Sequence, residues 1–206
     1  MNRLRFEIAK FRQDEAQLST LGLPRAALLE RLESRRVALV GNARALAATD
    51  FGREIDMADL VIRLNSAPMP AARSHGSRTD WLAMSTPVPE ATLRDRRPDL
   101  LLWMTAKRKR LPWRIARREG FHLNPADENA RLRRRLDAPA TTGLMVIDLL
   151  ARSGVSRAAL YGFDFFASKS LSGRRDATQV PHDFDAERLF VEMLLSTDPR
   201  FVHRKG

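Results

Sequence analysis

Short apolar runs alternate with longer polar or amphipathic stretches along most of the chain. Each run is rich in Val, Leu and Ile, and most end at a Gly, Asn, Ser or Thr, as buried strands of a parallel sheet do. The pattern predicts strands over residues 36–41, 58–65, 79–85, 99–105, 157–166 and 201–205. Between them lie charged, Pro-rich or helical segments.

Helical spacing of apolar residues is clearest near the two ends of the chain and before the fifth predicted strand. Residues 1–33 predict two helices, separated by Gly22 and Pro24, with apolar faces made by Leu4, Ile8 and Phe11 and by Leu28, Leu29 and Leu32. Residues 141–154 form a third, with a Thr cap and a Gly stop, and residues 185–196 a fourth. Strands that alternate with helices predict a single doubly wound α/β domain with a mostly parallel sheet over residues 34–206, preceded by the helical segment 1–33.

The carboxyl ends of the predicted strands should form one rim, because the strands are parallel. Ligands of such sheets bind beyond these ends. The rim would carry Gly41, Asn42, Asn65, Ser85, Thr86, Thr105, Gly162 and Phe163. The helix that begins at Thr141, Thr142 and Gly143 should face the same rim, where its free N–H groups and partial positive charge suit a phosphate.

The charge balance points to an anionic partner. The 206 residues include 36 Lys and Arg and carry a formal net charge of +11. The cations either bind nucleic acid, a phosphorylated small molecule or an anionic membrane surface, or form solvated helix faces. Residues 107–118, KRKRLPWRIARR, leave the same alternatives open: RNA binding, membrane contact or a plain charged helix.

Cysteine is absent, which excludes disulfides and Cys-ligated metals and favours a reducing, cytoplasmic location. Residues 1–18 are charged throughout and have no apolar core, so we expect no secretory signal. No apolar run reaches the length of a membrane span.

Several common sites do not fit the sequence. Residues 41–46, GNARAL, follow a strand but have one glycine only, which disfavours a nicotinamide site. No P-loop or zinc-binding spacing occurs, and no metal is expected. His182 follows a loop and opens the last helix; it is either a solvated histidine or a general base. Glu187, five residues on, could fix the local chain by hydrogen bonding.

Three segments, in order, resemble the motifs of the eukaryotic-type sialyltransferase family, glycosyltransferase family 29. Residues 37–68, VALVGNARALAATDFGREIDMADLVIRLNSAP, resemble its long motif. Residues 138–166, APATTGLMVIDLLARSGVSRAALYGFDFF, resemble its short motif, and residues 182–187, HDFDAE, its very short motif. The resemblance implies a Rossmann-like, GT-A-like fold that takes a CMP-activated sugar.

The resemblance also assigns site residues. It implies that His182 is the catalytic base, supported by Glu187. Substrate contacts would come from Gly41, Asn42, Ala43, Asn65, Thr141, Thr142, Gly143, Gly162 and Phe163. The two asparagines would hold the CMP phosphate and ribose, because an amide supplies both a donor and an acceptor without adding charge.

Two departures from the family are visible. Its disulfide between the long and short motifs would join Val37 to Gly154 or Val155 here, where an apolar contact would replace it. Its second histidine, implied to bind the donor phosphate, is missing, and Lys169, Arg174 or Arg175 could supply the charge.

The resemblance therefore predicts an inverting, metal-independent glycosyltransferase without a cofactor. It would move sialic acid, another nonulosonic acid or Kdo from a CMP donor to a glycan or glycolipid hydroxyl. Contact with an anionic membrane surface would be peripheral, and no nucleic acid is expected. The alternatives are a degenerate homologue that binds CMP or a glycan without catalysis, and a basic protein that binds nucleic acid or membranes.

Overall fold

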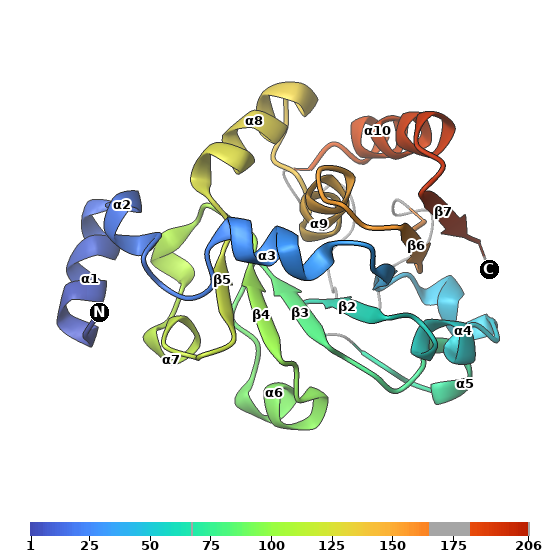
Figure 1. The fold of residues 1–206 in the computed structure, drawn as a ribbon, viewed down its shortest axis with the longest axis horizontal. Helices are drawn as coiled ribbons and strands as arrows, with labels where there is room; N and C mark the ends of the chain where they lie inside the picture. The colour runs from blue at the N-terminus through green and yellow to red at the C-terminus, as the bar shows by residue number, and fades with distance from the viewer. Residues whose placement is uncertain (67, 165–181, 206) are drawn as a thin grey trace.

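The computed structural model describes residues 1–66, 68–164 and 182–205. Its centre is a sheet of seven described strands, all parallel, in the order β5-β4-β3-β2-β1-β6-β7 (Figure 1). The strands are β1 (Arg36–Val40), β2 (Leu60–Leu64), β3 (Trp81–Met84), β4 (Leu100–Trp103), β5 (Phe121–Leu123), β6 (Arg157–Tyr161) and β7 (Phe201–Arg204). The six predicted strands are confirmed, and β5 is additional.

Helices fill most of the remaining described chain. The α-helices are α1 (Arg3–Arg12), α2 (Glu15–Leu18), α3 (Arg25–Leu32), α4 (Gly52–Asp56), α5 (Ala72–His75), α6 (Glu90–Arg96), α7 (Trp113–Ala116), α8 (Ala126–Leu136), α9 (Thr142–Ala151) and α10 (Phe184–Thr197). Two 3₁₀ turns are η1 (Arg44–Ala48) and η2 (Arg108–Arg110). None of the described helices is long and apolar enough to cross a membrane.

Both faces of the sheet are covered, because its strands are apolar on both sides. In β1, Val37 and Leu39 face a core shared with α3, α8, α9 and α10. Ala38 and Val40 point the other way, toward η1 and α4, as the two-residue period of a strand requires. Near β4 and β5, the second face packs against α1, α2, α6 and α7. This is the three-layer α/β arrangement predicted from the sequence.

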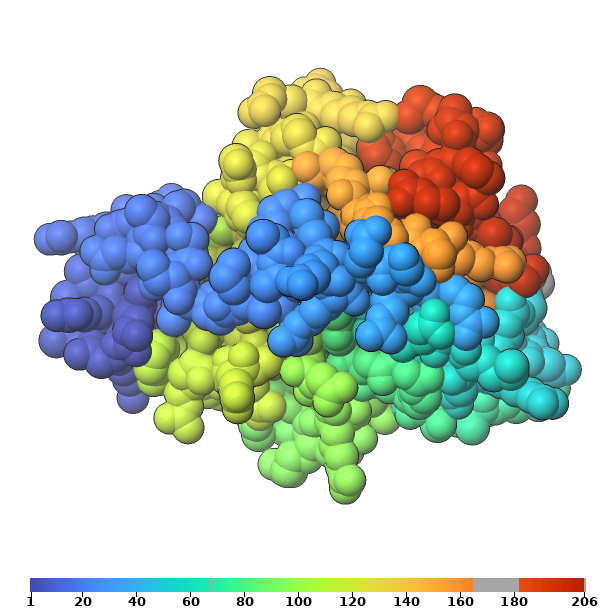
Figure 2. Space-filling view, viewed as in Figure 1, coloured from blue at the N-terminus to red at the C-terminus, as the bar shows by residue number. Residues whose placement is uncertain are grey.

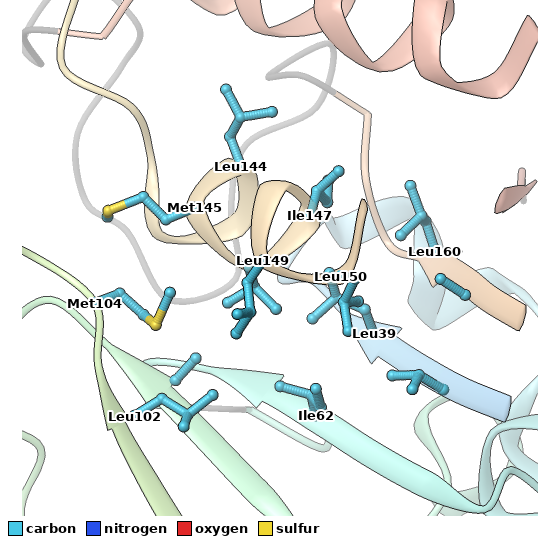
Figure 3. Packing of buried hydrophobic residues seen from close by; sticks show 14 of the residues in the cluster. Leu39, Ile62, Leu102, Met104, Leu144, Met145, Ile147, Leu149, Leu150 and Leu160 are labelled. Atoms are coloured by element: carbon cyan, nitrogen blue, oxygen red, sulfur yellow. The ribbon is translucent and has the colours of Figure 1, made fainter. Parts of the chain in front are cut away.

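Helix α9 lies at the centre of the upper layer and is buried all round. All residues from Thr142 to Leu150 are buried. Figure 3 shows Leu149 and Leu150 directed toward Leu39, Ile62 and Leu102 of the sheet. Burying each such leucine contributes roughly 1.5–3 kcal/mol, so the sheet holds α9 and its N-terminus firmly in place.

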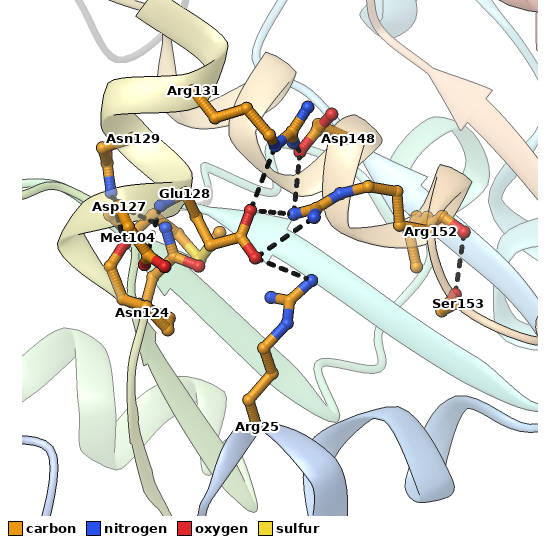
Figure 4. Close-up of polar contacts among 12 residues, drawn as sticks. Arg25, Met104, Asn124, Asp127, Glu128, Asn129, Arg131, Asp148, Arg152 and Ser153 are labelled. Atoms are coloured by element: carbon orange, nitrogen blue, oxygen red, sulfur yellow. Dashed lines mark hydrogen bonds and ion pairs between the residues drawn. The ribbon is translucent and has the colours of Figure 1, made fainter.

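A cluster of ion pairs joins α3, α8 and α9 on the outside of this layer (Figure 4). Glu128 of α8 lies among three arginines: Arg25 at 3.4 Å, Arg131 at 3.3 Å, and Arg152, which follows α9. Asp148 of α9 pairs with Arg131 and with Arg152. The arginines are partly exposed, so each pair contributes little alone, but together they tie three helices at one point.

The positions that would correspond to the family's disulfide are apolar neighbours in the same core. Val37 and Val155 are both buried and belong to one cluster. Gly154 instead faces the carboxylate of Glu33. Both valines are thus part of the apolar core, and the correspondence of these positions to the family's disulfide stays a prediction.

The N-terminal segment packs on the sheet through only part of its predicted apolar faces. Leu28 and Leu32 are buried, as predicted. In α1, however, Phe6 and Ala9 enter the core, while the predicted face of Leu4, Ile8 and Phe11 is exposed. Whether residues 1–33 form a unit separate from residues 34–206 stays a prediction.

Candidate active site

The sheet has a topological switch point between β1 and β6. From β1 the chain continues to β2 on one side, and the strand on the other side, β6, is added about 120 residues later. Doubly wound sheets bind ligands in the crevice outside such a point. The segments that follow β1 and β6 carry Gly41–Ala43 and Gly162–Phe163, five of the residues predicted to contact the substrate.

These two segments touch through their backbones. The N–H of Gly41 donates to the carbonyl of Tyr161 at 2.7 Å, and the N–H of Ala43 donates to Gly162 at 3.1 Å. A Cβ atom on Gly41 would lie 2.3 Å from the Gly162 oxygen, and Gly162 itself has φ +66°. Both glycines are therefore required by the close approach of the chains.

The two asparagines lie at adjacent strand ends. The Nδ2 atom of Asn42 is 3.4 Å from the carbonyl oxygen of Leu64, the residue before Asn65. Asn65 adopts a left-handed φ of 52°, and its Oδ1 accepts a hydrogen bond from the N–H of Ser85 at 3.3 Å. Within the described residues, Oδ1 of Asn42 and Nδ2 of Asn65 have no such partner, so one acceptor and one donor remain for a ligand.

The start of α9 is fixed to the same rim. The hydroxyl of Thr142 donates to the hydroxyl of Ser85, just past β3, at 2.7 Å. A Cβ on Gly143 would lie 2.8 Å from the ring of Phe163, so only glycine admits this ring. The N–H groups of the first helical turn have no partners within the helix, and they supply the partial positive charge that an anion requires.

Thr141 caps α9 and is held by α10. Its hydroxyl accepts a hydrogen bond from the Leu144 N–H at 3.2 Å. Its own N–H and hydroxyl donate to the carboxyl group of Glu187 at 2.6 Å and 2.7 Å. Burial raises the pKa of Glu187 to about 7, against the opposing effect of these two hydrogen bonds.

His182 lies beside the same turn. Its Nδ1 atom is 2.6 Å from the carbonyl oxygen of Pro139, two residues before Thr141. A carbonyl only accepts, so Nδ1 carries the proton, and Nε2 of the neutral ring keeps a free electron pair. The contacts thus run without a break from Asn42 through Asn65, Ser85 and the start of α9 to the beginning of α10.

A model of glycosyltransferase family 29 (sialyltransferase) matches residues 3–111, slightly more than half of the chain. The chain belongs to glycosyltransferase family 29. This confirms the predicted enzyme class, a sialyltransferase-type glycosyltransferase that uses a CMP-sugar. The match covers the long-motif segment, whereas the short-motif and very-short-motif segments lie beyond it.

Solved structures of sialyltransferases have the same fold. The chain is 21% identical to a mammalian sialyltransferase, with a TM-score of 0.67, and the alignment covers 94% of this chain and 79% of that one. For CstII from Campylobacter jejuni in complex with cytidine-5'-monophosphate, the identity is 14%, the TM-score 0.55 and the coverage 83% and 80%. These likenesses confirm the Rossmann-like α/β fold. No curated protein matches the chain by sequence.

The structure brings nearly all predicted site residues of this family 29 chain to one rim. Lys169, and with it Arg174 and Arg175, lies outside the described residues. Ser85 was predicted to lie on the rim but not to belong to the site, although it bridges Asn65 and Thr142. The Pro139 carbonyl, which orients His182, was not predicted, because a main-chain group has no signature in the sequence.

A hollow of about 350 Å³ adjoins the contact between the segments after β1 and β6. It is lined by Ala43, Gly162 and Phe163 on the side of the rim, and by residues of η1, α10 and β7. Arg188 and Arg204 on its wall are cationic, but they are paired with Asp185 and Glu192 and with Glu54, respectively. Small and aromatic residues of the rim therefore border a space whose other walls carry both apolar and charged side chains.

The basic segment 107–118 is not one amphipathic helix. It forms η2 and the four-residue α7, separated by Leu111 and Pro112. Leu111 and Ile115 are buried in the core, and Trp113 packs against Phe6 with ring centroids 5.2 Å apart. Most of its apolar surface is thus used for packing, and its exposed side chains are mainly cationic.

Proposed function

We propose that this protein transfers an acidic sugar from a CMP-linked donor to a hydroxyl of a glycan or glycolipid, with inversion and without a metal ion. The sugar is sialic acid, another nonulosonic acid or Kdo, all of which are carboxylated ketoses. The observation that carries the proposal is the unbroken set of contacts that gathers Asn42, Asn65, Thr142 and His182 on one rim.

In this proposal the nucleotide lies across the switch point. The CMP phosphate faces the first turn of α9, whose free N–H groups stabilise its negative charge, while the Thr142 hydroxyl holds this turn to Ser85. The amides of Asn42 and Asn65 hold the phosphate and ribose. Glu187 does not contact the nucleotide in this proposal. It fixes the Thr141 cap and thereby positions the start of α9.

His182 is the proposed general base. The hydrogen bond to Pro139 holds the proton on Nδ1, so that Nε2 can take the proton of the acceptor hydroxyl. The acceptor oxygen then forms a bond to the anomeric carbon as the bond from that carbon to the CMP phosphate breaks. Attack from the face opposite the departing CMP inverts the configuration.

A metal ion has no part in this mechanism. Asp183 and Asp185 have the spacing of a metal-binding pair, but Asp183 caps α10 by accepting the Ala186 N–H at 2.9 Å, and Asp185 pairs with Arg188. In the part of the chain that the structure describes, no cluster of three metal-ligating side chains occurs. The roles of Asp183 and Asp185 in capping and ion pairing support the proposal.

The test compares two variants of His182 in a CMP-release assay with CMP-sialic acid or CMP-Kdo and an added acceptor glycan. His182→Ala removes both ring nitrogens. His182→Asn keeps a donor near the position of Nδ1 but has no base. We expect both to lose transfer and to bind CMP within about twofold of the wild type by calorimetry, with CMP preferred over UMP and AMP. Transfer by His182→Asn at near the wild-type rate would show that His182 only positions the loop.

Wild-type protein that binds CMP but releases none from any donor would instead support a degenerate binding homologue. We also propose a cytoplasmic location with peripheral contact to an anionic membrane, as the absence of cysteine and the net positive charge suggest.

A further inference from the structure

Helix α1 presents a row of large apolar side chains to the outside. Leu4, Ile8 and Phe11 are 70%, 44% and 83% exposed, and Met1, just before the helix, is 43% exposed. At 3.6 residues per turn, the three helical residues fall within about 60° of one another. Apolar side chains that gather in one exposed patch mark interaction sites more often than scattered ones do, so this row is a candidate contact surface.

The row is held rigidly by the opposite face of the helix. Phe6 and Ala9 are buried against the body of the protein, and the Phe6 ring packs on Trp113. Lys10 donates to the carbonyl oxygen of Leu111 at 3.2 Å. Figures 1 and 2 show α1, in dark blue, at the end of the molecule farthest from β7. A partner that binds the row would therefore leave the rim at the switch point free.

Cations flank the row on both sides, and the one acidic residue of the helix, Glu7, lies beside the row on the Arg3 side and pairs with Lys10 at 2.8 Å. On a helical wheel, Arg5 and Arg12 lie about 90° to one side of the row and Arg3 lies about 90° to the other. All three are exposed and form no ion pair with a described residue. Helix α1 packs beside η2, whose neighbourhood adds further exposed cations: Lys107, Lys109 and Arg110.

We propose that α1 lies in the plane of an anionic membrane surface, with Leu4, Ile8 and Phe11 inserted below the phosphate groups. An apolar row between arginines is the arrangement by which interfacial helices bind, since the side chains enter the acyl boundary while the guanidinium groups contact the phosphates. The proposal is independent of the transfer reaction, although it would bring the enzyme to lipid-linked acceptors.

A second copy of the chain fits this surface less well. Four partly exposed side chains supply well under the ~800 Å² that each partner of a stable dimer buries. Two α1 helices packed face to face would also bring their arginines together. An anionic bilayer satisfies both the apolar row and the cations.

Vesicle sedimentation tests the proposal with purified full-length protein. We expect binding to vesicles of phosphatidylcholine with phosphatidylglycerol, and much weaker binding to phosphatidylcholine alone. The double variant Leu4→Ser with Phe11→Ser should reduce the partition coefficient at least ~10-fold, because two large side chains no longer insert. Leu189→Ser, at another largely exposed leucine (59%, against 70% for Leu4) on α10, is the control and should bind as the wild type does.

The variant Phe11→Trp reports insertion directly. Trp81 and Trp103 are buried, but Trp113 is half-buried and packs on Phe6 of the same helix. A change in emission with vesicles is therefore assigned to position 11 only where it exceeds that of the wild type. We expect a blue shift and quenching by lipids brominated near the headgroup. All substituted side chains are exposed, so folding should be preserved, which circular dichroism checks.

Three results would overturn the proposal. The first is vesicle binding that survives Leu4→Ser with Phe11→Ser and disappears in salt, which would make the contact purely electrostatic. The second is a dimer in solution that the same variant dissociates, without vesicle binding by the wild type. The third is a monomer that binds no vesicles. None of these depends on whether the protein transfers sugar.

Discussion

Glu187 is expected to make the stability of this protein depend on pH in a way that a single substitution isolates. The side chain is 4% exposed, and burial raises its pKa from 4.5 to about 7, with a further rise from the nearby charge of Asp183. The folded state therefore holds a proton that the unfolded chain releases. The stabilising contribution is complete below pH 4.5 and is lost as the pH rises through 7.

The size of the effect follows from the shift. A difference of roughly 2.5 pKa units corresponds to about 3 kcal/mol between acidic and alkaline conditions. Glu187→Gln resembles the protonated acid, since its amide oxygen can still accept from Thr141. We expect the free energy of unfolding of this variant, relative to the wild type, to rise by about 3 kcal/mol between pH 4.5 and pH 8.

The measurement is urea denaturation of both proteins across this range. Burial lowers the pKa values of His75, His122 and His203, so these residues destabilise the fold in acid. Their contribution is the same in both proteins and cancels in the difference between the two free energies of unfolding. Glu192→Gln, on the same helix but with a 54% exposed side chain, should shift the curve by under ~0.5 kcal/mol at every pH. If the difference between Glu187→Gln and the wild type were the same at pH 5 and pH 8, the carboxyl group would not titrate in a desolvated site.

Two further substitutions test the frame of the site. Gly41→Ala would force a methyl group to within 2.3 Å of the Gly162 carbonyl oxygen. We expect the free energy of unfolding to fall by more than ~2 kcal/mol and CMP binding to be lost. Gly154→Ala meets only the movable carboxylate of exposed Glu33 and should change stability by less than ~1 kcal/mol; equal effects of the two changes would contradict the role of the close approach. Arg63→Met removes the buried donor to the carbonyls of Arg78 and His75, both at 2.7 Å, and should cost about 3–5 kcal/mol in urea denaturation. Arg157→Met, at the exposed start of β6, is the control, and a comparable cost there would refute the importance of the buried hydrogen bonds.

Most of the fold was predictable because its strands are buried on both faces. Continuous apolar runs such as those of β1 and β4 have few other interpretations once helices alternate with them. Strand β5 escaped prediction because it has three residues, with His122 at its centre, whose ring bonds to the Leu23 carbonyl. His122 can be buried because the Leu23 carbonyl satisfies its ring, and that partner is far away in the sequence.

Helix α1 shows a different limit. Its sequence contains two apolar edges, and periodicity alone does not say which one packs against the protein. The edge with more large residues, Leu4, Ile8 and Phe11, is outside, because Phe6 finds Trp113 on the body of the protein. That partner lies more than 100 residues away, so the choice depends on tertiary contacts.

The candidate site was predictable where side chains follow strands, and less so where the main chain acts. Asn42 and Asn65 were located by the strand ends that precede them. The roles of Ser85 and of the Pro139 carbonyl depend on distances between elements far apart in sequence. These links appear only when α9 and α10 are placed over the sheet.

The parallel run of β7 beside β6 has a practical consequence for anyone who produces this protein. Arg204 is paired in register with Tyr161, so the chain leaves the sheet next to the glycine turn at Gly162. An affinity tag or fused domain attached there would lie beside the rim on which we propose that the sugar donor binds. A tag at the other terminus would instead cover the apolar row of α1, so neither end is a neutral handle, and a cleavable one should be removed before either activity or vesicle binding is measured.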